Sequence, residues 1–357
     1  MLKWMLVFVP IAILLEFVAP ERHLLVFLAA ALAIVPLAGW LGRATEQLAE
    51  RSGEGVGGLL NATFGNATEL IIALSAMRAG LHDVVKASVA GSIVGNILLV
   101  LGAAMLAGGL RHQEQQFNAS AARSQATLLT LAAIALILPA AYNAVVAPRA
   151  PHGLQTLSLY ISLVLLLVYG LFLVYSLVTH KNLFSGDPDA IHDQHQQAIW
   201  SKGKALLVLA AATGMIAWVS EILVAAIEPS ARQLGLSNLF VGVFIVAILG
   251  NAAEHSSAIS AAMKNRMDLS LAIAIGSSVQ VALFVAPVLI LASYFISTAP
   301  MDLAFSSGLV LSMLLAVLIT GQVAGDGRSD WLKGVQLLAV YLILGLAYFF
   351  TPDVTVS

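Results

Sequence analysis

Long apolar runs separated by short polar segments cover nearly the whole chain. Each run has about the 20 residues that a helix needs to cross the hydrocarbon core of a bilayer. The expected spans are residues 4–19, 23–42 with a polar continuation through Arg51, 58–78, 84–109, 124–146, 155–178, 204–228, 239–263, 269–295, 301–322 and 332–350. The pattern therefore predicts an all-α polytopic membrane protein with eleven transmembrane helices.

One polar segment, residues 181–202, is long enough to divide the chain. We expect an N-terminal transmembrane helix at 1–20, a five-helix block at 22–180 and a second five-helix block at 203–351. Because each block holds an odd number of helices, the second would run through the membrane inverted. The predicted plan is one N-terminal helix plus two inverted five-helix repeats.

Two motifs of the first block occur again in the second block. Both are displaced by the same number of residues, the number that separates position 69 from position 254. Gly65-Asn66-Ala67-Thr68-Glu69 returns as Gly250-Asn251-Ala252-Ala253-Glu254, and Gly91-Ser92 returns as Gly276-Ser277. A shared offset in two consecutive spans is hard to obtain by chance. Inverted repeats are typical of secondary transporters, whose site lies near the midplane where the repeats meet.

Composition supports membrane insertion and narrows the function classes. The 357 residues are 60% hydrophobic and only 10% charged, whereas a soluble domain carries about 25% charge. The absence of cysteine rules out disulfides, thiolate nucleophiles and Cys-ligated metals. With a formal net charge of −2 and no basic run, no nucleic-acid partner is expected, and membrane lipid is the expected surrounding.

Lysine and arginine predict the orientation. If the N-terminus and the loops after even-numbered spans share one side, that side holds twelve of the 17 lysines and arginines. The positive-inside rule makes it cytoplasmic. The N-terminus and segment 181–202 are then cytoplasmic, and the C-terminus is outside. Short termini and loops favour the inner (cell) membrane of a prokaryote.

The first repeated motif places carboxylates inside apolar helices. Glu69 and Glu254 are ionisable residues at membrane depth, and such residues are functional-site candidates by default. An asparagine precedes each by three residues, on the same helix face. The glycine before each asparagine lets the backbone open or approach closely, so we expect discontinuous helices that expose their ends to a cation. The residues concerned are Gly65, Asn66 and Glu69, and Gly250, Asn251 and Glu254.

The span after each motif adds polar side chains on one face. Ser92 and Asn96 are four residues apart, and Ser277 and Gln280 are three apart. Apart from His255, which follows the second glutamate, the ligating atoms on offer are oxygens. That set suits a hard divalent cation such as Ca²⁺ better than zinc, which prefers His and Cys ligands.

Structural roles compete with ligand roles at several of these positions. The two asparagines could instead cap the ends of broken helices, and the two serines could merely allow tight helix packing. His255 is either a pH-responsive gate or a packing residue. The first block has Leu70 in its place, so His255 is not part of the symmetric set.

Charge balance suggests how such a site would work. Two facing glutamates amount to −2, which one divalent cation or two protons neutralise. Leaving both bare in a low-dielectric site is costly, so the site would cross the membrane loaded but not empty. Glu69 and Glu254 are therefore the predicted metal-binding residues and, with His255, the predicted proton-coupling residues. An enzyme is not expected, because the sequence has no paired nucleophile and base and no HExxH motif.

Four stretches carry a family resemblance, namely residues 58–70, 246–255, 276–280 and 326–331. At these residues the sequence resembles the Ca²⁺/proton antiporter (CAX-type) family of the cation/Ca²⁺ exchanger superfamily. The resemblance implies an eleven-helix fold with a central Ca²⁺ site at Glu69 and Glu254. It also links His255, Asn96 and Gln280 to that site.

We therefore expect a secondary active antiporter that exports cytosolic Ca²⁺ in exchange for protons by alternating access. Ca²⁺ and H⁺ are the transported partners and compete for the two glutamates, no cofactor is expected, and homo-oligomerisation stays open. The alternatives are a Na⁺-coupled Ca²⁺ exchanger and a divalent cation channel of the same architecture. Many members of the family carry a strongly acidic stretch between the halves, where this chain has only Asp187, Asp189 and Asp193.

Overall fold

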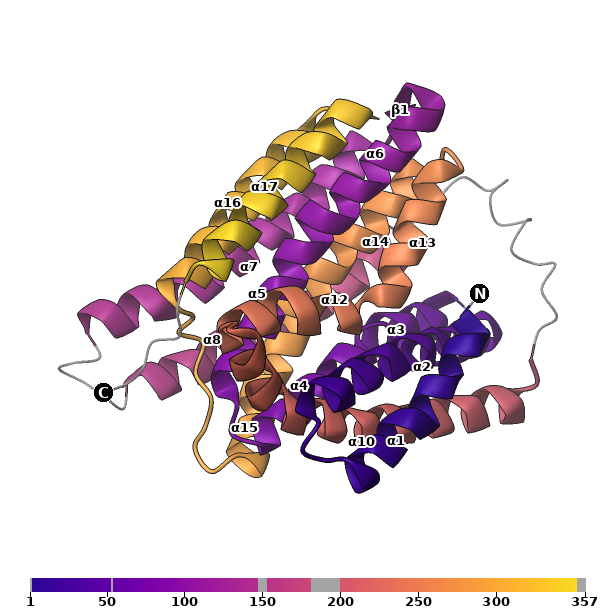
Figure 1. Cartoon of the computed structure of the whole chain (residues 1–357). Coiled ribbons are helices and arrows are strands. Elements are labelled where there is room, and N and C mark those ends of the chain that lie inside the picture. The colour runs from indigo at the N-terminus through magenta and orange to yellow at the C-terminus, as the bar shows by residue number, and fades with distance from the viewer. Residues whose placement is uncertain (1, 53, 147–152, 181–199, 352–357) are drawn as a thin grey trace.

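The computed structural model describes residues 2–52, 54–146, 153–180 and 200–351, nearly all of them helical (Figure 1). Before residue 181 the elements are η1 (Leu2–Val7), α1 (Phe8–Val18), α2 (His23–Ser52), α3 (Glu54–Phe64), α4 (Ala67–Arg78), α5 (His82–Val94), η2 (Gly95–Val100), α6 (Leu101–His112), β1 (Glu114–Gln116), α7 (Ala119–Val145), α8 (Gly153–Val174) and η3 (Tyr175–Thr179). From residue 200 they are α10 (Lys202–Leu234), α11 (Asn238–Phe240), η6 (Val241–Val246), α12 (Ala247–Gly250), α13 (Ala252–Met263), α14 (Met267–Gln280), η7 (Val281–Val285), α15 (Ala286–Ile296), α16 (Ser307–Gly325), β2 (Arg328–Asp330) and α17 (Trp331–Phe349).

Among the described residues, eight continuous helical segments are long and apolar enough to cross a membrane. A ninth candidate is the pair Asn238–Gly250 and Ala252–Met263, which meet at a bend of 65°. Two further predicted spans do not meet that criterion, because Trp4–Val18 is short and the span at 58–78 is divided between α3 and α4. The chain is therefore a multi-span helical membrane protein, and the count of eleven stays a prediction.

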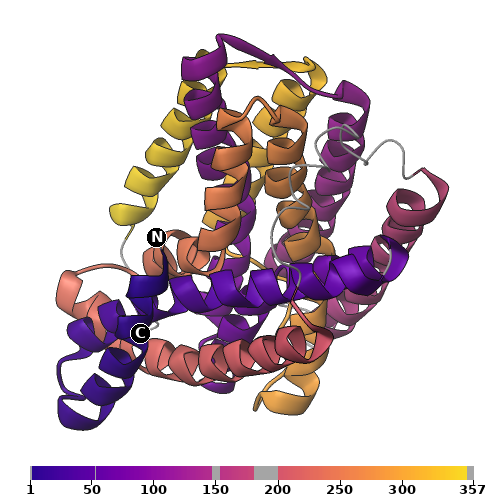
Figure 2. The same ribbon diagram turned by 90° about the vertical axis from the view of Figure 1, so that its right-hand side faces the viewer.

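The long helices are arranged in two groups. In Figure 1, α6, α13, α14, α16 and α17 lie alongside one another, while α1, α2 and α10 run across the lower part of the molecule. Helices α2 and α10 pack side by side (Figure 2). Small side chains allow this close approach, since the buried face of α2 includes Ala29, Ala30, Ala33 and Ala38.

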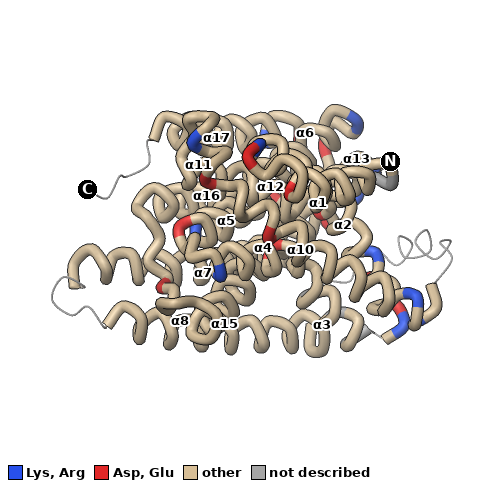
Figure 3. The backbone as a smooth tube through the Cα atoms, turned by 60° about the horizontal axis from the view of Figure 1, so that its bottom comes forward, with Lys and Arg blue, Asp and Glu red and all other residues tan. Residues whose placement is uncertain are grey.

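Charged residues are sparse along the helices, so most of the tube in Figure 3 is tan. Among the described acidic residues, Glu69 alone is buried as a whole residue. The apolar core runs through both sequence blocks without a break. A single core of this kind holds residues from the two blocks in fixed contact, and the candidate site lies within it.

One feature outside the helical expectation is a small antiparallel sheet. Strand β1 pairs with β2, with Gln115 opposite Ser329. The pairing continues through a hydrogen bond from the Phe117 amide to the Gly327 carbonyl, 3.0 Å away. Three-residue strands in polar loops leave no recognisable pattern in the sequence, so helical periodicity could not predict them.

The described residues contain four π-helical segments, of which η3 ends helix α8 and the other three interrupt helices around the core. Segments η2 and η7 occupy corresponding places in the two blocks, because the offset between the repeated motifs carries Gly95–Val100 onto 280–285. Segment η6 has no π-helical counterpart, since the corresponding residues 56–61 lie inside the α-helix α3. π-Helical turns are frequent at functional sites, and η2, η6 and η7 border the repeated motifs.

Candidate cation site

Both repeated motifs lie where a helix is interrupted, as the glycines predicted. Helix α3 ends at Phe64 and α4 begins at Ala67, while α12 ends at Gly250 and α13 begins at Ala252. Asn66 (φ −98°, ψ 19°) and Asn251 (φ −103°, ψ 6°) have nearly the same backbone conformation. The two motifs therefore fold in the same way, and each places its glutamate in the first turn of the helix that follows.

The glycine of each motif faces the glutamate of the other. A Cβ atom at Gly250 would lie 2.7 Å from Cγ of Glu69, which is closer than packed side chains allow. A Cβ atom at Gly65 would lie 3.7 Å from Oε1 of Glu254. The two helix breaks thus approach each other closely, and Gly250 has no room for a side chain.

Glu69 is buried and unevenly bonded. Its Oε1 accepts a hydrogen bond from the hydroxyl of Ser92 at 2.5 Å and another from the amide of Asn251. Its Oε2 is buried and has no hydrogen-bond partner among the described residues. A buried carboxylate oxygen without a partner is costly, so this atom has the capacity to take a cation or a proton.

Glu254 is half-buried and has fewer partners. Its Oε2 accepts a hydrogen bond from the hydroxyl of Ser277 at 2.7 Å. This contact repeats that of Glu69 with Ser92, because both pairs are 23 residues apart. The amide of Asn66 donates to Oε1 of Gln280 at 2.5 Å. Asn251 donates to Glu69, so its equivalent Asn66 would be expected to donate to Glu254. The amide of Asn66 donates to Gln280 instead.

Hydroxyls and amides also bond across the two sequence blocks. The amide of Asn251 donates to the hydroxyl of Ser92 at 3.2 Å. The hydroxyl oxygen of Ser277, whose one proton is shared with the nearer Glu254, also lies 3.1 Å from Oδ1 of Asn66. Neither asparagine side chain caps a helix, so the capping alternative does not apply. The serines are more than packing residues, because each bonds a glutamate and an asparagine.

His255 joins this network through Asn96. The Nε2 atom of His255 lies 3.3 Å from Oδ1 of Asn96, and the amide of Asn96 donates to the hydroxyl of Ser277 at 3.1 Å. An amide oxygen only accepts, so the imidazole is the donor in this bond. A chain of hydrogen bonds therefore connects His255 to Glu254. Leu70, at the corresponding place in the first block, packs against the apolar core.

All the predicted site residues thus lie together around the two helix breaks. The described residues contain no group of three or more His, Cys, Asp or Glu side chains that could hold a metal. A cation between the motifs would instead rely on two carboxylates supplemented by amide and hydroxyl oxygens. Such an oxygen set fits Ca²⁺, which accepts six to eight oxygen ligands in flexible geometry.

Comparison with known proteins gives the family. The sodium/calcium exchanger protein family matches residues 22–178 and 204–350. The chain belongs to this family. The Ca(2+)/H(+) antiporter of Aphanothece halophytica is 45% identical over 363 residues, which cover 98% of this chain and 96% of that protein. The Ca(2+)/H(+) antiporter ChaA of Bacillus subtilis is 44% identical over 317 residues, covering 88% and 89%. The CAX-type resemblance of the motifs is therefore confirmed.

Solved structures agree with this assignment. Native YfkE is similar to this exchanger-family chain with a TM-score of 0.83 and 38% identity, over 98% of this chain and all of that one (100%). A crystal structure of the H⁺/Ca²⁺ exchanger CAX matches with a TM-score of 0.72 over 98% of this chain and 91% of that one. At 16% identity the second likeness shows the fold alone.

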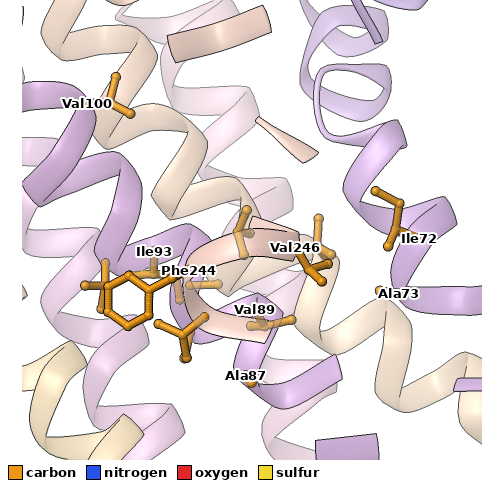
Figure 4. Close-up of a cluster of buried hydrophobic side chains, with 14 of the residues drawn as sticks. Ile72, Ala73, Ala87, Val89, Ile93, Val100, Phe244 and Val246 are labelled. Atoms are coloured by element: carbon orange, nitrogen blue, oxygen red, sulfur yellow. The ribbon is translucent and has the colours of Figure 1, made fainter. Parts of the chain in front are cut away.

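The half-helices before the two breaks are covered very differently in this exchanger. Val241 of η6 is 2% exposed, whereas Val56 of α3, its equivalent in the first block, is 56% exposed. Segment η6 packs on α5, where Phe244 and Val246 lie among Val89 and Ile93 (Figure 4). Helix α3 packs instead on α2. The half-helix before the second break is thus covered by apolar packing that the half-helix before the first break lacks.

The sequence did not predict two ion pairs between residues that lie far apart in the chain. Lys86 of α5 pairs with Asp302, their side chains 13% and 28% exposed, at 2.7 Å. Arg78 pairs with Glu221 at 3.2 Å, with both side chains exposed. Both pairs join the two sequence blocks. The sequence indicates these ion pairs only weakly, because it shows no more than opposite charges near span ends on the same predicted side of the membrane. The predicted linker 181–202 lies almost entirely outside the described residues.

Proposed function

We propose that this protein is a secondary active antiporter that exports cytosolic Ca²⁺ in exchange for protons by alternating access. One observation carries the proposal. Two membrane-embedded glutamates stand at matched helix breaks, and the buried Oε2 of Glu69 has no partner within the described chain. The curated relatives named Ca(2+)/H(+) antiporter support the choice of ions.

Charge neutrality couples the two ions. With both glutamates ionised the site carries −2, and a single Ca²⁺ or two protons cancel that charge. The uncompensated pair is disfavoured in a low-dielectric interior, so reorientation of an empty site is slow. Because the site binds either Ca²⁺ or protons but not both, each outward movement of Ca²⁺ requires an inward movement of protons.

The supporting side chains have distinct roles in this scheme. Ser92 and Ser277 orient one oxygen of each carboxylate, and Asn251 fixes Glu69 from the opposite block. Gln280 and Asn66 hold each other and supply further oxygens beside Glu254. Through Asn96, His255 acts on Ser277 and so on the second glutamate. Ca²⁺ is a transported substrate here, and the scheme requires no resident cofactor.

The repeat and the topology are part of the same proposal. Two five-helix repeats at 22–180 and 203–351, inverted relative to each other, would follow an N-terminal helix at 1–20, giving eleven spans. The two family matches at 22–178 and 204–350 support this division. Charge distribution supports a cytoplasmic N-terminus and an external C-terminus, and the cyanobacterial and Bacillus relatives support a prokaryotic cell membrane.

The half-helix that begins at η6 is more buried than the half-helix α3. This difference supports one direction in which the candidate site opens. Under the proposed orientation α3 begins on the cytoplasmic side and η6 on the outer side. The exposed α3 and the packed η6 then correspond to a site that is sealed toward the outside. Alternating access would exchange these two environments.

The function is tested with purified protein in proteoliposomes. We expect Ca²⁺ uptake to follow an imposed pH gradient and to ignore an imposed Na⁺ gradient. Uptake that needs Na⁺ and ignores pH would make the protein a Na⁺-coupled exchanger. Unsaturable Ca²⁺ flux without proton movement would make it a channel.

The site assignment is tested in the same vesicles with Glu69→Gln and Glu254→Gln. Each should reduce pH-driven uptake by at least about 100-fold, because a neutral amide neither binds Ca²⁺ as strongly nor releases a proton. Glu228→Gln is the matched control, since the Glu228 side chain is partly exposed and pairs only loosely with Arg232 at 3.8 Å. Normal uptake by either site variant would refute the assignment.

A further inference from the structure

Each site carboxylate lies in a helical hairpin whose turn is contacted by the opposite sequence block. The two site hairpins are α4–α5, which carries Glu69 and Ser92, and α13–α14, which carries Glu254 and Ser277. The segment after α15, residues 297–304, lies against the first hairpin. The segment after α6, residues 112–118, lies against the second.

The segment 297–304 is firmly anchored although it contains no helix. The Met301 amide donates to the hydroxyl of Ser293 at 2.9 Å, and the Leu303 amide donates to the hydroxyl of Ser158 at 3.0 Å. Met301 and Leu303 are themselves buried. Because two of its main-chain donors are satisfied by buried serines of α15 and α8, this segment offers a fixed surface to its neighbours.

Helix α5 is attached to that surface at two points. The Lys86 ammonium donates to Oδ1 of Asp302 at 2.7 Å and to the Ala304 carbonyl at 3.0 Å. Asp302 Oδ1 also accepts the Ala304 amide at 2.7 Å, which closes the turn around the ion pair. One turn earlier, Nε2 of His82 lies 2.7 Å from the hydroxyl of Ser297.

The second hairpin is attached in the corresponding place by different chemistry. The Gln115 amide donates to the Ala262 carbonyl at 2.9 Å and to Oδ1 of Asn265 at 3.0 Å. The Asn118 main-chain amide donates to Oδ1 of Asp268 at 2.7 Å. The offset between the repeated motifs carries 112–118 onto 297–303, so the two attachments are related in sequence. Hydrogen bonds from neutral amides dominate the attachment of the second hairpin, whereas an ion pair forms the attachment of the first hairpin.

The ion pair stands close to the candidate site along α5. Lys86 precedes Ser92 by six residues, which is about 9 Å along a helix. Ser92 in turn holds Oε1 of Glu69. A movement of the outer end of α5 would therefore displace the hydroxyl that orients the first carboxylate.

We infer that the Lys86–Asp302 ion pair, with the segment 297–304 that surrounds it, is a positioning element that fixes the α4–α5 hairpin and thereby the geometry of Glu69. The inference rests on the proposed exchange function. Lys86 and Asp302 bond each other and Ala304 rather than the site carboxylates, so we expect their effect on Ca²⁺ affinity rather than on the ability to couple protons.

A double-mutant cycle in proteoliposomes tests the inference through apparent KM and Vmax for pH-driven Ca²⁺ uptake. Lys86→Met and Asp302→Asn should each raise the apparent KM at least about threefold, with Vmax within about twofold. The double variant should be impaired about as much as the worse single one, because both substitutions remove the same interaction. Lys86→Arg keeps the charge and should stay within about twofold of wild type.

The exposed pair Arg78–Glu221 provides the matched control, because it also joins the two blocks near the turn of the α4–α5 hairpin. Exposed pairs contribute little, so Arg78→Met and Glu221→Gln should leave KM unchanged. The inference is overturned if both single variants keep the wild-type KM, or if the two effects multiply in the double variant, which would show that the residues act independently.

The melting temperature of each purified variant separates positioning from folding. If the single variants do not fold, the double variant and Lys86→Arg still decide the question. A wild-type protein without pH-driven uptake would refute the proposed function instead, and the same cycle would then be measured as the Ca²⁺-induced rise in melting temperature.

Discussion

The hydroxyl of Ser278 donates a hydrogen bond to the main-chain carbonyl of Ile93 at 3.3 Å, across a sequence separation of 185 residues. That separation equals the offset of the repeated motifs, so the two residues occupy equivalent places in the two blocks. A residue that touches its own equivalent must lie near the axis that relates the two copies. Under the proposed inverted repeat, the axis passes between α5 and α14, beside the candidate site.

The neighbouring serines 277 and 278 should therefore differ sharply when replaced. Ser277→Ala removes the donor to Glu254 and should raise the apparent KM for Ca²⁺ at least about tenfold. Ser278→Ala removes one buried hydrogen bond, a loss of about 1 kcal/mol, and should lower the melting temperature by a few degrees with transport retained. Uptake and melting assays on the two variants check this. Equal transport defects in both would contradict the separation of roles.

Gly250 should tolerate no side chain. The Cβ of a Gly250→Ala variant would meet Cγ of Glu69 at 2.7 Å and push the carboxylate out of position. We expect pH-driven uptake to fall at least about tenfold while the protein still purifies as a folded species. Gly321→Ala is the control, because nothing lies within 4 Å of that position. A fully active Gly250→Ala would show that the helix breaks can separate at no cost.

The two asparagines should contribute unequally despite their matched backbone conformations. Asn251 donates directly to Glu69, whereas the amide of Asn66 is taken by Gln280. Asn251→Ala should consequently weaken Ca²⁺-dependent uptake several-fold more than Asn66→Ala. Apparent KM values for both variants measure the difference. The reverse order would mean that the oxygen of Asn66 contributes more to Ca²⁺ binding than the bond from Asn251 to Glu69 does.

Asp326, just before β2, and Lys333, in the first turn of α17, form an ion pair. This pair should stabilise the folded protein at neutral pH and lose that effect at acid pH. Lys333 donates to Oδ2 of Asp326 at 2.6 Å, and this hydrogen bond, together with the positive charge of Lys333, holds the pKa of that carboxyl below its ordinary value. Since the pKa is depressed in the folded state, the contribution is complete above about pH 4 and is lost as the pH falls through the folded-state value.

The corresponding measurement compares melting temperatures of wild type and Asp326→Asn at several pH values. A small difference at neutral pH should disappear under more acidic conditions and should shrink in high salt, because the pair is exposed. A difference that grows on acidification would have the wrong sign for this pair.

The sequence alone predicts the parts of the site that local rules govern. Gly65 and Gly250 mark the helix breaks because glycine permits the backbone to open. Glu69 and Glu254 attract notice because charge in an apolar helix is rare. The spacing of each glutamate from its serine is preserved in both blocks, so their proximity could be expected.

The remaining contacts depend on how the blocks pack. Nothing in the chain indicates that Asn251 reaches Glu69, 182 residues away, or that Gln280 captures Asn66. Both asparagines have the same local sequence context, and only the side chain across the interface distinguishes them. The unequal cover of Val56 and Val241 is likewise invisible locally, because the two residues are identical.

That identity has an energetic consequence for the proposed transport cycle. Reorientation in that cycle would uncover Val241 while covering Val56. At this matched position the gain and the loss cancel, whereas unmatched positions such as Gly58 and Val243 make no such balance. A bound ion must discriminate between two orientations by about 5.5 kcal/mol to move their populations from about 1:99 to about 99:1. Each matched pair therefore reduces the energy that the cargo must supply to decide which way the protein faces.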